Sequence, residues 1–127
     1  IVGRKTYDKV LSMGVEFPHL DKDCYVLTRS DRADEGNLRF YNGDLGALVK
    51  RLKSEDGKNI FCDGGAEVIH QLLQLEVVDD FILSIIPTFL GDGIRLFKDG
   101  RPELPLQLVR SQSFKSGLVQ LHYRKAE

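Results

Sequence analysis

Three short segments of the sequence combine the residue types that bind phosphate groups. The segments are Gly-Arg-Lys-Thr at 3–6, Leu-Thr-Arg-Ser at 27–30 and Asp-Gly-Gly-Ala-Glu at 63–67. The first two supply the positive charges of Arg4, Lys5 and Arg29, and the third supplies Gly64 and Gly65, which leave the backbone open to a close approach. Two of the segments begin helical patterns, and a helix N-terminus favours anions through its free N–H groups and its dipole. Together the segments predict a site for a ligand with more than one phosphate.

Each segment also has a plain structural explanation. A Gly-Gly pair before a helix is often only a turn that needs positive φ, and Arg or Lys at the end of a strand is often only solvated. All three segments, however, leave strand-like runs. Because ligands of an open α/β sheet bind outside the carboxyl ends of its strands, the convergence of three such segments favours a binding site over three separate turns.

The elements that position these segments can be recognised from the spacing of apolar residues. Helical spacing predicts three helices, with the apolar stripes Tyr7-Val10-Leu11, Leu45-Leu48-Val49-Leu52 and Val68-Ile69-Leu72-Leu73. Gly14 is a suitable end for the first helix, and Asp44 is a suitable N-cap for the second. Strand-like runs lie at the start of the chain and at 24–29, 38–41, 59–63 and 81–86, and the alternating tail from 119 to 124 forms part of a C-terminal hairpin.

The order of these elements predicts an α/β fold. Strands that alternate with helices form a mainly parallel sheet with helices on both faces, and an antiparallel hairpin can lie at one edge of such a sheet. The run from Phe81 to Ile86 is almost continuously apolar. We therefore expect it to be a central strand that is covered on both faces.

The composition argues against several classes of protein. The 127 residues fit one domain, and a net charge of −1 without a basic stripe argues against a nucleic-acid binder. No apolar run approaches the roughly 20 residues that a membrane span needs. Cys24 and Cys62 are expected to be buried free thiols, and with the three histidines they lack the spacing of a zinc site. The sequence has no P-loop, nucleophile elbow or Cys-His arrangement, and Gly-Asp-Gly at 91–93 is interpreted as a turn.

Four blocks of the sequence, taken in order, resemble the dihydrofolate reductase-like superfamily. They are Val-Gly-Arg-Lys-Thr-Tyr at 2–7, Val-Leu-Thr-Arg-Ser at 26–30, the run from 60 to 73 around Asp-Gly-Gly, and the run from 77 to 97. The last block is the most specific. Its Val-Asp-Asp strand, Pro, Leu-Gly-x-Gly and Leu-Phe are typical of the branch that contains the RibD C-terminal domain of bacterial riboflavin biosynthesis and its small stand-alone members. The resemblance covers nearly the whole chain and implies a three-layer dihydrofolate reductase-like fold, with a mostly parallel central sheet, flanking helices and an antiparallel C-terminal hairpin.

The resemblance also implies a cofactor, NADPH, and hydride transfer to a pterin-like or ribosylaminopyrimidine-like substrate. It places the cofactor's phosphates along Gly3, Arg4, Lys5 and Thr6. It places the adenosine end against Leu27, Thr28, Arg29 and Ser30, where an Arg can pair with the 2′-phosphate and favour NADPH over NADH. It places the pyrophosphate and the nicotinamide side against Gly64, Gly65, Ala66, Glu67, Val68 and Ile69. Asp63 is expected to contact the substrate where it meets the cofactor.

One departure from the family concerns the start of the chain. In the family, a strand, a substrate-contacting loop and a helix precede the segment that corresponds to 3–6, and this sequence starts at Ile1 without them. The resemblance therefore implies that 1–127 is a single domain, incomplete at its N-terminus. The acid that protonates the substrate in dihydrofolate reductases comes from that preceding region, so no catalytic acid is assigned in this chain.

The leading hypothesis is an NADPH-dependent reductase, and the alternative is a nucleotide-binding module that kept the fold and lost the reaction. A flavodoxin-like signalling domain is a third interpretation, but the segment at 3–6 does not fit the phosphate loop that such a domain requires. The resemblance suggests a homodimer, with residues 81–86 and the C-terminal strands as contributors. NADPH use and two unpaired cysteines are typical of a cytoplasmic enzyme, and neither nucleic acid nor membrane is expected as a partner.

Overall fold

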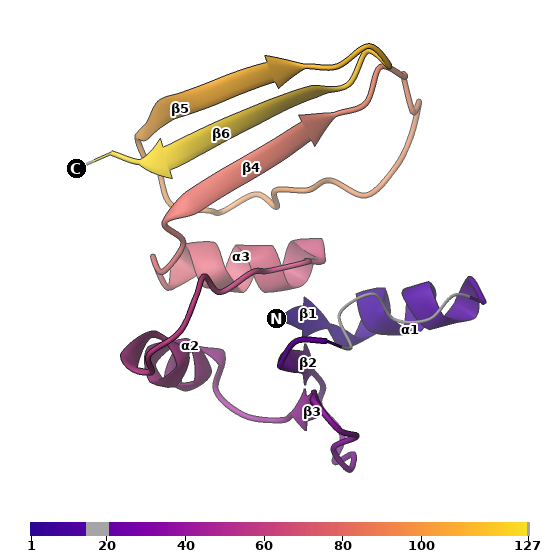
Figure 1. Ribbon diagram of the computed structural model, residues 1–127, viewed down its shortest axis with the longest axis vertical. Coiled ribbons are helices and arrows are strands. Elements are labelled where there is room, and N and C mark those ends of the chain that lie inside the picture. Colours follow the sequence, from indigo (N-terminus) through magenta and orange to yellow (C-terminus); the bar gives the residue numbers. More distant parts are fainter. Residues whose placement is uncertain (15–20, 127) are drawn as a thin grey trace.

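The computed structural model describes residues 1–14 and 21–126, which form two three-stranded β-sheets and three helices (Figure 1). The helices are α1 (Arg4–Ser12), α2 (Leu45–Ser54) and α3 (Ala66–Gln74). The first sheet contains β1 (Val2–Gly3), β2 (Cys24–Leu27) and β3 (Leu38–Tyr41), and the second contains β4 (Asp80–Ile85), β5 (Leu106–Ser113) and β6 (Val119–Lys125). None of the three described helices has the length and apolar character that crossing a lipid bilayer requires.

The first sheet is parallel, in the order β1-β2-β3, and a further stretch of chain pairs with β1 on its other side. The amide of Asp63 donates to the carbonyl of Ile1 at 3.0 Å, and the amide of Gly3 donates to the carbonyl of Gly64 at 2.7 Å. The strand expected at 59–63 is therefore reduced to a short stretch that pairs in parallel with β1. This stretch brings the Gly-Gly pair directly beside the start of α1.

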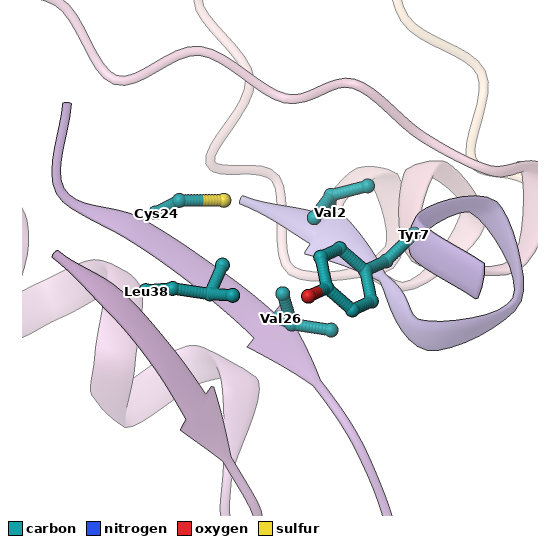
Figure 2. Close-up of a cluster of buried hydrophobic side chains, with 5 residues drawn as sticks. All are labelled: Val2, Tyr7, Cys24, Val26 and Leu38. Atoms are coloured by element: carbon teal, nitrogen blue, oxygen red, sulfur yellow. The ribbon is translucent and has the colours of Figure 1, made fainter. Parts of the chain in front are cut away.

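Helices cover both faces of the parallel sheet. Val2, Cys24, Val26 and Leu38 point to one face and pack with Tyr7 of α1, as Figure 2 shows. The alternate residues of β2 point to the other face, where they pack against a cluster formed by the apolar stripes of α2 and α3. That cluster consists of Leu45, Leu48, Val49, Val68 and Leu72. The predicted layers are thus confirmed, and α1 lies on one side of the sheet with α2 and α3 on the other. The predicted stripes are confirmed except at Leu11 of α1, which is 42% exposed.

The second sheet is antiparallel, in the order β4-β6-β5. The predicted C-terminal hairpin is confirmed, because β5 and β6 are joined by a turn in which the amide of Gly117 donates to the carbonyl of Phe114 at 2.9 Å. Figure 1 shows this sheet on the far side of α3 from β1–β3. The α/β class and its flanking helices are confirmed, with the parallel and antiparallel strands in two sheets rather than one.

The prediction for residues 81–86 was wrong. Among the described residues β4 pairs only with β6, in antiparallel fashion, and is not a central parallel strand. Ile82 and Ile85 remain 60% and 54% exposed, so neither face is fully covered. The physical reason is that a continuous apolar run indicates a strand but does not fix how many of its faces are buried.

Candidate functional site

The carboxyl ends of the parallel strands bring the three predicted phosphate-binding segments together. Gly3, at the end of β1, is in register with Leu27 of β2 and bonded to Gly64 on its other side. Thr28 follows directly, and its amide donates to the carbonyl of Tyr41 at the end of β3 at 3.0 Å. The segments at 3–6, 27–30 and 63–67 therefore leave the same edge of the sheet side by side, as the sequence predicted.

The first turns of α1 and α3 meet in a contact that requires glycine. A Cβ atom on Gly65 would lie 3.1 Å from Oγ1 of Thr6, and a Cβ atom on Gly3 would lie 3.1 Å from Cγ2 of Val68. Both distances are tighter than ordinary side-chain contacts. Gly64 has a φ of +96°, a conformation that L-residues with side chains rarely adopt, and the Gly64–Gly65 peptide bond is cis. A Cβ atom at Gly3 or Gly65 would therefore require Val68 or Thr6 to shift, so the absence of side chains favours this close approach.

Both of these helices start without a side-chain cap. Gly3 and Gly65 occupy the N-cap positions of α1 and α3, and within the described residues no side chain accepts a hydrogen bond from either first turn. By contrast, the carboxylate of Asp44 caps α2 by accepting from the amide of Ala47 at 2.9 Å. Free N–H groups at a helix start can donate to an anion and are aligned with the helix dipole. Two adjacent uncapped starts therefore make an anion site that the fold leaves open.

Positive charge surrounds this edge of the sheet. Arg4 and Lys5 are exposed on the first turn of α1, and Arg4 forms an ion pair with Asp8 at 3.5 Å, one turn further along. Arg29 is exposed beyond β2, and no carboxylate within residues 1–14 and 21–126 pairs with its guanidinium. The charge of Arg29 is thus available to an anionic ligand, whereas that of Arg4 is shared with Asp8.

The loop that carries Arg29 is shaped by side-chain hydrogen bonds. Oγ1 of the buried Thr28 accepts from the amide of Ser30 at 3.2 Å and lies 3.1 Å from the Ser30 hydroxyl. Asn42, which the sequence did not single out, donates through Nδ2 to the carbonyl of Arg29 at 3.3 Å and to Oδ1 of Asp31 at 3.4 Å. The position of Asn42 directly after the strand-like run at 38–41 was the one available signal, since the carboxyl ends of neighbouring parallel strands share an edge.

Asp63 is less clearly part of this edge. It precedes Gly64, yet it lines a cavity of about 490 Å³ together with Ile1, Cys24 and other residues at the beginnings of β1 and β2. This cavity lies beside the start of the strands, whereas the three segments leave the strand ends. A substrate contact for Asp63 stays a prediction.

The two cysteines lie near Asp63. Cys24 is buried and Cys62 is half-buried, and both are free thiols. Burial is the main reason that the pKa of each thiol is raised. Cys24 belongs to the apolar cluster around Tyr7, and Cys62 packs against the cluster between α2 and α3. A thiol with a raised pKa is a poor nucleophile at neutral pH.

Glu67 connects the candidate site to a distant part of the chain. It is exposed on the first turn of α3, where its carboxylate accepts hydrogen bonds from Nζ of Lys98 and, at 3.3 Å, from Nε2 of Gln71. These hydrogen bonds, that from Lys98 first, lower the pKa of Glu67 below its usual range. The other predicted residues of α3 lie on its first turns, with Ala66 half-buried, Val68 buried and Ile69 bonded to the carbonyl of Gly65. Lys98 was not predicted, because only the path of a long loop brings it to α3.

The sequence as a whole matches a known family over most of its length. The sequence profile of the RibD C-terminal domain matches residues 17–120. The chain belongs to the RibD C-terminal domain family. The match includes Asp63, the segment at 27–30 and the first turns of α3, whereas the segment at 3–6 precedes it.

Two proteins from Bacillus subtilis (strain 168) resemble the chain in sequence. The uncharacterized protein YwjB is 40% identical over 127 residues, which span 99% of this chain and 72% of YwjB. The uncharacterized protein YyaP is 37% identical over 102 residues, which span 80% of this chain and 54% of YyaP. Neither protein has an assigned activity, so both leave the activity of this chain open.

Solved structures support the fold. A candidate riboflavin biosynthesis protein from Shewanella sp. PV-4 matches with a TM-score of 0.86 and 24% identity, over 99% of this chain and 72% of that protein. A pyrimidine reductase-like protein from Corynebacterium diphtheriae matches with a TM-score of 0.66 and 18% identity, over 99% of this chain and 75% of that protein. The chain thus shares its arrangement of helices and strands with these two proteins.

Proposed function

We propose that the protein is an NADPH-dependent reductase that transfers hydride to a pterin-like or ribosylaminopyrimidine-like substrate. The observation that carries this proposal is the meeting of two uncapped helix starts, at Gly3 and Gly65, in a chain of the RibD C-terminal domain family. An anion site with two adjacent sets of N–H donors suits a pyrophosphate, which has two phosphate groups next to each other.

The residues present fit the phosphates of such a cofactor. Side chains at Gly3 and Gly65 would fill the space between α1 and α3, as their close contacts with Val68 and Thr6 show. The N–H groups of both first turns would hold the pyrophosphate, and Arg4 and Lys5 would balance its charge. No residue in this set needs to react, because positioning and charge balance are its contribution.

Arg29 is the residue that we propose for choosing between NADPH and NADH. Its guanidinium has no carboxylate partner in the described part of the chain, and Asn42 fixes the carbonyl of Arg29 and so the path of its loop. A guanidinium can bind a 2′-phosphate through two charge-assisted hydrogen bonds, and NADH has no such phosphate. The free charge of Arg29 therefore supports a preference for NADPH.

NADPH, when bound, supplies the hydride, and the acceptor gains that hydride together with one proton. The contribution of this chain to the reaction is to orient the ligand against the first turns of α1 and α3. We assign the role of proton donor to none of the described residues, and Asp63 is proposed only as a polar contact for the substrate. The substrate class is inferred from the RibD C-terminal domain family, to which the chain belongs.

Titration of full-length protein with NADPH and NADH, followed by the fluorescence of the reduced nicotinamide, tests the cofactor. Tighter binding of NADPH supports the proposal, and undetectable or equal binding of both contradicts it. NADPH oxidation is then measured with dihydrofolate and with the ribosylaminopyrimidine of riboflavin synthesis as acceptors. Binding of NADPH without oxidation in the presence of either acceptor would favour the alternative of a nucleotide-binding module.

A further inference from the structure

The segment between β4 and β5 is fixed to α3 by two polar contacts. This segment, residues 86–105, contains neither helix nor strand. Nζ of Lys98 forms an ion pair with Glu67 at the start of α3, and Nε2 of Gln74 at the end of α3 donates to the carbonyl of Gly100 at 2.6 Å. In Figure 1 the segment runs back along α3 before it reaches β5. Loops of this length without secondary structure are usually functional or disordered, and this one is held to the helix that carries the Gly-Gly pair.

The ion pair controls the direction of the Glu67 carboxylate. A Glu in the first turn of a helix places its negative charge close to the free N–H groups of that turn. Here Oε2 of Glu67 accepts from Lys98 and Oε1 accepts from Gln71, one turn further along the helix. Both contacts draw the carboxylate along α3 and away from its N-terminus, which has no side-chain cap within the described residues. Lys98 also brings a positive charge that balances that of Glu67.

We propose that Lys98 is a positioning residue that keeps the start of α3 open to the phosphates of NADPH. Without Lys98 the negative charge of Glu67 is unbalanced beside the first N–H groups of α3, and it repels a phosphate at those groups. This inference rests on the proposed function, since it explains how the phosphates of NADPH can bind at the first turn of α3 although Glu67 places a negative charge there. It goes beyond that function because Lys98 itself need not touch the ligand.

The test compares the wild type with Lys98→Gln, Glu67→Gln and the double variant in NADPH titrations. We expect Lys98→Gln to weaken NADPH binding by about two- to fivefold, the effect of one unbalanced charge at a helix start. Glu67→Gln should bind at least as tightly as the wild type, because the competing charge is removed while the backbone N–H of residue 67, the group proposed to face the phosphates, stays in place. The double variant should recover wild-type affinity, since a neutral residue at position 67 has no charge for Lys98 to balance.

Lys53 offers a matched control. It is a similarly exposed lysine that also joins a helix to a connecting segment, through an ion pair with Asp79 at 3.0 Å and a hydrogen bond to the carbonyl of Val77 at 2.9 Å. Lys53→Gln should leave NADPH affinity unchanged. The deficit of Lys98→Gln should shrink as ionic strength rises, because salt screens exposed charges. If Lys98 only anchored the loop, Glu67→Gln would be as harmful as Lys98→Gln and the double variant would not recover, which would overturn the inference.

The outcomes separate this inference from the proposed function. If the wild type binds NADPH and Lys98→Gln behaves like Lys53→Gln, the positioning role is overturned and the proposed function stands. If the wild type does not bind NADPH, the proposed function fails, and inorganic pyrophosphate titrated against the same four proteins decides the role of Lys98. Weaker pyrophosphate binding by Lys98→Gln with recovery in the double variant supports it, and any other result overturns it.

Discussion

At the scale of single residues, Gly64 and Gly65 meet two different requirements. Gly64 has a φ of +96°, so its backbone conformation requires glycine. Gly65 has an ordinary extended backbone, but a Cβ atom there would lie 3.1 Å from Oγ1 of Thr6. The pair is therefore a turn and a close approach at once. The turn brings the start of α3 against α1, and the approach of a ligand to the backbone of this pair stays a prediction.

The conformation of Gly64 makes a testable prediction about stability. Gly64→Ala should lower the free energy of unfolding by about 1–3 kcal/mol, because an L-residue is strained at this φ. Gly57→Ala is the control, since a Cβ atom at Gly57 would have no heavy atom within 4 Å and the φ of Gly57 lies outside the left-handed region. Its effect should stay within about 0.5 kcal/mol. Chemical denaturation of both variants measures the difference, and equal losses would contradict the role of the positive φ.

Arg29 makes a prediction about cofactor choice. Arg29→Ala should weaken NADPH binding by about tenfold or more, which corresponds to a lost hydrogen bond to a charged group, and should change NADH binding much less. Titration with both dinucleotides measures the ratio. Arg110→Ala, on β5 and outside the three segments, should change neither affinity. An equal loss for NADPH and NADH would remove Arg29 from the 2′-phosphate role.

At the scale of elements, the sequence predicted the features that depend on residues close together in the chain, and it missed features that depend on distant contacts. The cap and stripe of α2 were predicted because Asp44, Leu45 and Leu48 interact within one turn of one another. The surroundings of β4 were not predicted correctly, because an apolar run has the same pattern whether one face of the strand or both faces are covered. Lys98 and Asn42 were missed for a related reason, since each reaches the candidate site through the path of a loop rather than through a pattern in the sequence.

The pairing of β4 with β6 makes a prediction about pH. His122 and Arg124 on β6 hydrogen-bond to Oδ1 of Asp80 at 2.9 and 3.0 Å, and these contacts, that from His122 first, lower the pKa of Asp80. Because the folded pKa is depressed, the contribution of Asp80 to stability is present above the unfolded value of about 3.9. It is lost as the pH falls through the lower folded value.

The matching variant is Asp80→Asn. At about pH 6 it should be less stable than the wild type by up to about 1 kcal/mol, the range of exposed ion pairs. The difference should disappear as the pH falls below the folded pKa of Asp80. Urea denaturation of both proteins across this range measures it. A difference that does not change with pH would show that the ion pair is not its cause.

At the scale of the whole molecule, the two sheets differ in how fully their faces are covered. The parallel sheet is covered by helices on both faces, whereas one face of the antiparallel sheet carries a row of apolar residues that remain partly exposed. In register across the sheet, that row includes Phe81, Tyr123 and Leu108, followed along β4 by Leu83 and Ile85. Leu108 and Ile85 are 53% and 54% exposed. Apolar surface of this kind typically marks an interface between proteins.

We propose a second copy of the chain as the partner of this face, in agreement with the homodimer that the sequence suggested. Burial of Ile85 against a partner stabilises the dimer through the hydrophobic effect, and a lysine there would place a charge in an apolar contact. Light scattering coupled to size exclusion should therefore show a dimer for the full-length wild type and a concentration-dependent shift toward monomer for Ile85→Lys. Gln112→Lys is the matched control, because Gln112 is paired with Gln120 on the opposite face of the same sheet and should leave the dimer intact. A wild type that stays monomeric at every concentration, or a dimer that both lysine variants disrupt equally, would rule out this face as the interface.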